Sequence, residues 1–159
     1  MAMAQHDDDM LPHLYEGLLR FHQGEAAAAE KMFKKVADVD ASNAPALAYR
    51  TFIALGRKDM KAAKVLAGQA VDGGRREALA HLAQGLVLSA DPKQLEGARR
   101  ALREAVTLSP KQYAAEVKLA ELEAASSADS VRSRMVRLLG LDPTYLPAKR
   151  ILYLLDKRG

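Results

Sequence analysis

The feature that most limits how this chain can fold is a spacing of 34 residues, at which apolar and small side chains recur. The clearest series with this spacing are Leu14, Ala48 and Leu82, then Leu18, Phe52 and Leu86, and then Gly17, Thr51 and Gly85. Within one interval the apolar residues lie three or four positions apart, which is typical of one face of a helix. The interval leaves room for two short helices, and two such helices cannot bury their apolar faces alone. The sequence therefore predicts two-helix units that stack on one another.

The second helix of each predicted unit repeats more clearly than the first. Its apolar residues are Ala29, Phe33 and Val36, then Ala63, Ala67 and Ala70, and then Ala98, Leu102 and Ala105. Two later units end in Leu108-Ser109-Pro110 and Leu141-Asp142-Pro143, where the proline prevents the helix from continuing. Residues 145–157 are typical of one more helix, which would cover the last apolar face of the array.

At these residues the chain resembles the tetratricopeptide repeat (TPR) family, and the resemblance covers roughly residues 10–159. It implies an all-α fold, an α-solenoid of about four helix-turn-helix repeats with a C-terminal capping helix. The predicted repeats are residues 10–43, 44–77, 78–111 and 112–144, and the cap is residues 145–157. Residues 1–9 are polar and acidic, and we expect them to form a disordered tail.

Composition excludes several classes of protein. The chain has no cysteine, so disulfides, thiolate metal sites and thiol nucleophiles are absent. No stretch approaches the roughly 18 apolar residues that would suggest a membrane span, and the N-terminus lacks a signal-peptide pattern. We therefore expect a cytoplasmic protein. The net charge is +4, but residues 1–43 hold four basic and eight acidic side chains, whereas residues 146–159 hold four basic and one acidic.

The TPR resemblance implies that the first helix of each pair lines a concave groove. We place Leu14, Leu18 and Phe21 in the core, because the neighbouring register would bury the charged Glu16 and Arg20. In this register the groove residues are Tyr15, Leu19, His22, Tyr49, Ile53, Arg57, Ala83, Val87, Tyr113, Glu116 and Glu123. The alternative is that Tyr15, Leu19 and Ile53 simply pack against neighbouring units.

The expected ligand of this groove is a protein segment. Some TPR modules hold the C-terminal carboxylate of heat-shock chaperones with lysine, arginine and asparagine, and the resemblance places Tyr15, Leu19, Tyr49 and Ile53 at those positions. These side chains cannot donate charge-assisted hydrogen bonds to a carboxylate. An amphipathic helix or an extended apolar segment is therefore the better prediction.

Neither catalysis nor cofactor binding is expected. The histidines are not grouped with a nucleophile or at metal-ligand spacing, and no phosphate-binding loop is present. Arg99, Arg100 and Arg103 form a basic patch that we place on the convex side, but no aromatic residues alternate with them to stack on bases, so nucleic acid is not the expected partner.

The predicted function is a non-catalytic protein-interaction module or adaptor. The alternatives are a small chaperone of the TPR type for a secreted or assembling subunit, and a regulator that contacts nucleic acid through the three arginines.

Overall fold

The computed structural model describes residues 4–124 and 126–158, with side chains from Met10 onward, and this portion of the chain contains helices and no strand. The helices are α1 (Ala4–His22), α2 (Ala26–Val39), α3 (Ala44–Gly56), α4 (Met60–Gly73), α5 (Ala78–Ser89), α6 (Leu95–Leu108), α7 (Tyr113–Glu123), α8 (Ala128–Leu141) and α9 (Leu146–Arg158). A short 3₁₀ turn, η1 (Pro92–Gln94), precedes α6. The predicted all-α solenoid is thus confirmed.

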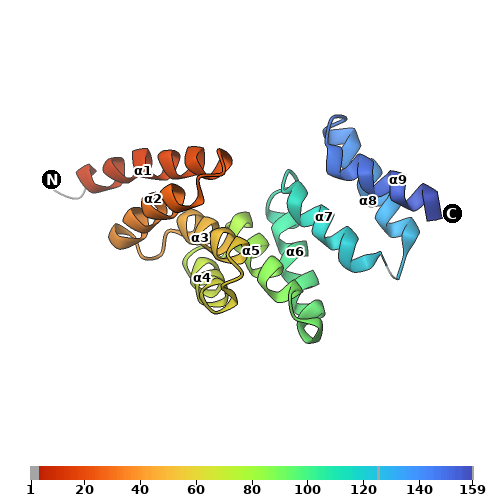
Figure 1. Ribbon diagram of the computed structural model, residues 1–159, viewed down its shortest axis with the longest axis horizontal. Helices are drawn as coiled ribbons and strands as arrows, with labels where there is room; N and C mark the ends of the chain where they lie inside the picture. Colours follow the sequence, from red (N-terminus) through yellow and green to blue (C-terminus); the bar gives the residue numbers. More distant parts are fainter. Residues whose placement is uncertain (1–3, 125, 159) are drawn as a thin grey trace.

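The helices stack in pairs along one axis, with the two ends of the chain at opposite ends of the array (Figure 1). α1 packs on α2, α3 on α4, α5 on α6 and α7 on α8, and α9 packs on α8. The first helices of successive pairs also pack on each other, α3 on α5 and α5 on α7. Within the described residues, the second helices of successive pairs do not pack on each other to a similar extent. The first helices therefore line the inner side of the array, as expected from the resemblance.

The turns between helices are fixed by short-range hydrogen bonds. The side chains of Asn43, Asp59 and Ser127 accept hydrogen bonds from backbone N–H groups in the first turns of α3, α4 and α8, which satisfies donors that have no partner within the helix. Gly24, between α1 and α2, has a φ of 79°, a backbone conformation that glycine adopts without strain.

The turn before α9 has the same construction as the turn before α3. The Asp142 carboxylate accepts hydrogen bonds from the Thr144 hydroxyl at 2.7 Å and from the Thr144 amide at 2.9 Å. Asp40 accepts the corresponding bonds from Ser42 at 2.8 and 3.0 Å. The bond from the Thr144 hydroxyl is the largest cause that lowers the pKa of Asp142 below its ordinary value. This turn sets the direction in which α9 leaves α8.

The core follows the second helices as the sequence predicts. The nine apolar positions predicted in the second helices of units one to three are all buried: Ala29, Phe33, Val36, Ala63, Ala67, Ala70, Ala98, Leu102 and Ala105. In α8, Val131, Met135 and Leu138 are buried and Leu139 is half-buried. Gly17 and Gly85 of the first helices lie directly against Phe33 and Leu102, so that each pair of helices approaches closely.

The structure differs from the expected tail over residues 1–9, because α1 begins at Ala4. Residues 1–3 lie outside the described portion of the chain.

Replacement of Gly85 by alanine should destabilise the protein. A Cβ atom at this position would lie 2.6 Å from the Leu102 side chain, and overpacking of this kind costs about 1–3 kcal/mol. Gly68 in α4 is the matched control, because a Cβ there would meet no atom within 4 Å. Gly68→Ala should therefore raise the free energy of unfolding by up to about 1 kcal/mol through helix propensity. Urea denaturation measures both values, and equal stability of the two variants would contradict the close packing at Gly85.

Candidate functional site

Tyr49 and Ile53 of α3, which we expected in the groove, pack instead on the preceding unit. The ring of Tyr49 stacks on that of Phe33 in α2, with 5.2 Å between centroids and 14° between planes. Ile53 is 4% exposed and belongs to the same core cluster as Phe33 and Val36. Burial raises the pKa of the Tyr49 hydroxyl. These two side chains therefore hold the first two units together, with Ile53 buried and Tyr49 half-buried.

Ala83 and Val87 of α5 have the same role in the next unit. Both are buried, and Val87 lies in a cluster with Ala63 and Ala67 of α4. Ala83 and Val87 lie 34 residues after Tyr49 and Ile53. They have the same role because the face that packs against the preceding unit recurs once in every repeat. Of the three residues named in the alternative of packing against neighbouring units, Ile53 packs in this way, whereas Tyr15 and Leu19 are exposed.

Tyr15 and Leu19 occupy the same positions in α1, where no earlier unit stands before them in the described residues. Their side chains are 65% and 52% exposed. His22 and Arg57 are exposed as well, at the ends of α1 and α3. The predicted groove residues of units one to three thus divide into an exposed set, Tyr15, Leu19, His22 and Arg57, and a set that packs between units, Tyr49, Ile53, Ala83 and Val87.

The inner side of the first helices carries residues that the sequence assigned to the core. Phe52 is half-buried and lies 6.4 Å from Phe21 of α1 between ring centroids, and it also packs against the core cluster of α5, α6 and α7. Leu18 and Leu86, one repeat away on either side, are half-buried too. Leu14, Leu18 and Phe21, which the chosen register places in the core, pack against the first core cluster, so this part of the register agrees with the structure. The groove positions inferred from it on α3 and α5 are instead occupied by packing between units.

In unit four the predicted groove residues Tyr113 and Glu123 are half-buried, and Glu116 is internal. Glu116 of α7 is buried, and its carboxylate forms ion pairs with Arg137 and, at 2.6 Å, with Arg134 of α8. Arg134 also donates to Glu123 at 2.9 Å. The Tyr113 ring packs on Tyr145, with 5.2 Å between centroids. A buried carboxylate is stable here because two guanidinium groups compensate its charge.

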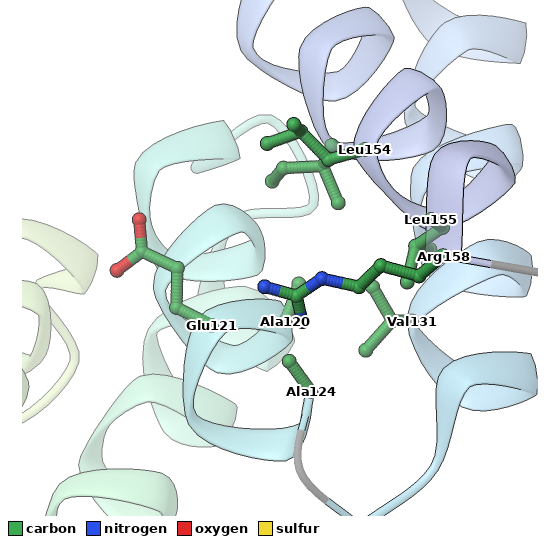
Figure 2. A pocket seen from close by; sticks show the side chains of 8 residues that line it. Ala120, Glu121, Ala124, Val131, Leu154, Leu155 and Arg158 are labelled. Carbon is green, nitrogen blue, oxygen red and sulfur yellow. The ribbon is translucent and has the colours of Figure 1, made fainter.

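An apolar groove lies between α7 and α9, outside the predicted site. One pocket of about 270 Å³ and a second of about 850 Å³ share Glu121, Ile151 and Leu154, so that they form one continuous depression. Figure 2 shows the first pocket, with Leu154 and Leu155 from α9 above Ala120 of α7, and with Arg158 reaching from α9 toward α7. We call this depression the C-terminal groove; its main residues are Val117, Glu121, Leu146, Ile151, Leu154 and Arg158.

The groove exists because α7 and α9 do not pack closely along their length. Ala148 of α9 is fully buried at the position held in earlier first helices by Ala46, Ala80 and Ala115, so α9 packs on α8 in the usual way. The direct packing that joins α3 to α5 and α5 to α7 has no counterpart of similar extent between α7 and α9 in the described residues. Large apolar side chains stay open to solvent as a result, with Leu146 73%, Tyr153 59% and Leu154 50% exposed.

The edge of the groove is basic. Among the described side chains, neither Arg150 nor Arg158 forms an ion pair, whereas Glu121 is paired with Lys118 at 3.0 Å. The groove therefore combines an apolar floor with uncompensated positive charge, a combination that suits an apolar segment flanked by acidic residues.

The predicted basic patch is largely neutralised. Arg99 donates a hydrogen bond to the Leu122 carbonyl at 3.0 Å and pairs with Glu96 at 3.3 Å. Arg103 pairs with Glu123 of α7 at 3.4 Å. Arg99 and Arg103 thus both contact the next unit, although the Arg103 side chain stays 56% exposed. Arg100 is exposed and forms no ion pair among the described side chains.

Two further kinds of site are absent from the described residues. These residues contain no group of three or more histidine, aspartate or glutamate side chains placed to hold a metal ion. None of the described helices has the length and apolar character needed to cross a membrane.

Replacement of Glu116 by alanine should cost about 3–5 kcal/mol of unfolding free energy, because it leaves two guanidinium groups without their buried partner. Glu121→Ala on the same helix is the control, since its exposed pair with Lys118 contributes no more than about 1 kcal/mol. Denaturant titrations of the two variants measure the difference. Similar stability of the two variants would show that the pairs of Glu116 add little to the cohesion of α7 and α8.

We compared the chain with protein families, with curated proteins and with solved structures. No family model and no curated protein matches the sequence. Solved structures with similar folds include the first TPR of Spaghetti (RPAP3) bound to the HSP90 peptide SRMEEVD, at 24% identity and a TM-score of 0.62 over 73% of this chain and 91% of that one. PilF of Pseudomonas aeruginosa is similar at 20% identity and a TM-score of 0.74, over 96% and 78% of the two chains. YrrB, described as a TPR protein with an unusual peptide-binding site, is similar at 20% identity and a TM-score of 0.62, over 99% and 81%. The fold of this chain is therefore the tetratricopeptide repeat fold.

Proposed function

We propose that the chain is a non-catalytic protein-interaction module that binds an apolar segment of a partner in the C-terminal groove. The observation that carries the proposal is the continuous apolar depression around Ile151 and Leu154, bordered by Arg150 and Arg158. Exposed apolar surface of this kind marks interaction sites on folded proteins. Side chains such as Leu154 and Tyr153 gain free energy when a partner removes them from water.

The similar folds support a role in peptide binding without identifying the peptide. One of them is solved with an HSP90 peptide and another is described by its peptide-binding site. The proposed site on this chain lies at α7 and α9 and not at the first helices of units one to three, because Ile53 and Val87 are occupied with packing between units.

A non-catalytic role is supported by what the groove offers chemically. The charged side chains that line it are Glu121, which is already paired with Lys118, and cations such as Arg150 and Arg158, which suit the binding of acidic residues. The pairing of Arg99 and Arg103 with glutamates weighs against the alternative of nucleic-acid contact, since paired guanidinium groups have less charge to offer a phosphate.

The proposal predicts that Leu154→Asp abolishes capture of the partner. A carboxylate on the groove floor introduces a charge that the bound apolar segment would have to desolvate, and a loss of at least about tenfold in affinity is expected, equivalent to about 1.4 kcal/mol. Affinity capture from a cell extract, quantified by mass spectrometry, compares the variant with the original chain.

The matched control is Val136→Asp, because Val136 on α8 is 57% exposed and lies outside the groove. It should capture the same proteins as the unmodified chain. Circular dichroism verifies that both variants stay helical. If Leu154→Asp retains its captured proteins, or if both variants lose them equally, the C-terminal groove is not the binding site.

A further inference from the structure

We propose that α1 of a second copy of this chain occupies the C-terminal groove, so that the protein associates with itself head to tail. The inference rests on the proposed function of the groove and names one partner for it. Three observations lead to it: an unpartnered packing face on α1, the placement of the two surfaces at opposite ends, and their opposite charge.

The exposed face of α1 is built for packing against a helix. Leu11, Tyr15 and Leu19 follow one another at intervals of four residues, and they are 47%, 65% and 52% exposed. At the positions equivalent to Tyr15 and Leu19 in α3, Tyr49 and Ile53 pack on the preceding second helix. The described portion of the chain provides no such helix for α1. This stripe is therefore a packing face of the repeat that lacks its usual neighbour.

The dimensions of the two surfaces agree. The stripe from Leu11 to Leu19 comprises nine residues and rises about 12 Å along the helix, and α9 from Leu146 to Arg158 rises about 18 Å. α1 and α9 lie at opposite ends of the array (Figure 1), so one copy cannot bring its own α1 into its own groove. Only a second copy can join these surfaces.

Charge favours this pairing over the symmetric ones. Residues 1–43 hold eight acidic and four basic side chains, including the acidic Asp7, Asp8 and Asp9 in the sequence that precedes the stripe. Of the basic ones, Arg20 is already paired with Glu16 and Glu25, each at 2.7 Å. Residues 146–159 hold four basic and one acidic. Contact between two α1 faces would bring like charges together, and so would contact between two grooves, whereas α1 against the groove brings opposite charges together.

Such an interface is heterologous, because the two surfaces that meet are different. Each copy keeps one free α1 face and one free groove after the first contact, so that association continues to longer chains unless a ring closes.

Sedimentation velocity tests the proposal over protein concentrations from about 1 to about 100 μM, where weak contacts of small area are populated. The average mass of the unmodified chain should rise with concentration, and it should fall as salt is added because the facing charges are screened. Tyr15→Asp and Leu154→Asp should each remain monomeric, while Val136→Asp should behave like the unmodified chain.

A mixture of Tyr15→Asp and Leu154→Asp gives the decisive result. The first variant keeps an intact groove and the second an intact α1 face, so the mixture should form pairs of one copy each and nothing larger. A constant mass of the unmodified chain at all concentrations would overturn the proposal. Loss of association in Tyr15→Asp but not in Leu154→Asp would also overturn it, since α1 would then meet another surface.

The same variants separate this inference from the proposed function. If the unmodified chain stays monomeric while Leu154→Asp loses a captured partner, the self-association is wrong and the groove still binds another protein. If Leu154→Asp alters neither the mass nor the captured proteins, both proposals are wrong.

Discussion

From α3 onward, each first helix packs on the second helix of the preceding unit, and the cohesion of the array depends on this contact. Tyr49 and Ile53 form it between units one and two, and Val87 forms it between units two and three. A two-helix unit is too small to be stable by itself, so these contacts supply the burial that the unit lacks. They also determine which side chains can bind a partner protein, because a side chain that is buried between two units is not accessible to one.

The second helices and the core side chains of α1 could be predicted from the sequence, whereas the groove residues of the first helices could not. Ala29, Phe33 and Val36 face one direction, because α2 buries one side only, and the period of a single face is readable. α3 packs on its own second helix, on the preceding one and on α5, so its buried residues lie on several sides: Ala44, Ala46, Leu47, Ala48, Thr51, Ile53 and Ala54. A helix that is apolar on several sides has no single periodicity to read. Our choice of register relied on keeping Glu16 and Arg20 out of the core, and this criterion does not distinguish the inner face from the face between units.

The C-terminal groove was missed for a different reason. It depends on the distance between α7 and α9, which are two helices apart in the sequence, and no local pattern encodes that separation. The ion pairs of Glu116 are equally hidden, since Arg134 and Arg137 lie 18 and 21 residues away and each residue alone is typical of a solvated surface. One signal was available: α9 carries Leu146, Ile151, Tyr153 and Leu154 on more than one side, which is more apolar surface than contact with α8 alone can bury.

The forces that hold the units together change along the array. All three phenylalanines of the chain, Phe21, Phe33 and Phe52, meet with Tyr49 at the N-terminal end, whereas Glu116, Arg134 and Arg137 join the helices of unit four. Hydrophobic burial weakens on cooling, while the cost of desolvating charged groups falls as temperature rises. Apolar burial acts at both ends, since Val131, Met135 and Leu138 form a core cluster in unit four. The buried ion pairs of Glu116 are an additional contribution at that end, and their relative weight in the cohesion of the array grows as temperature rises.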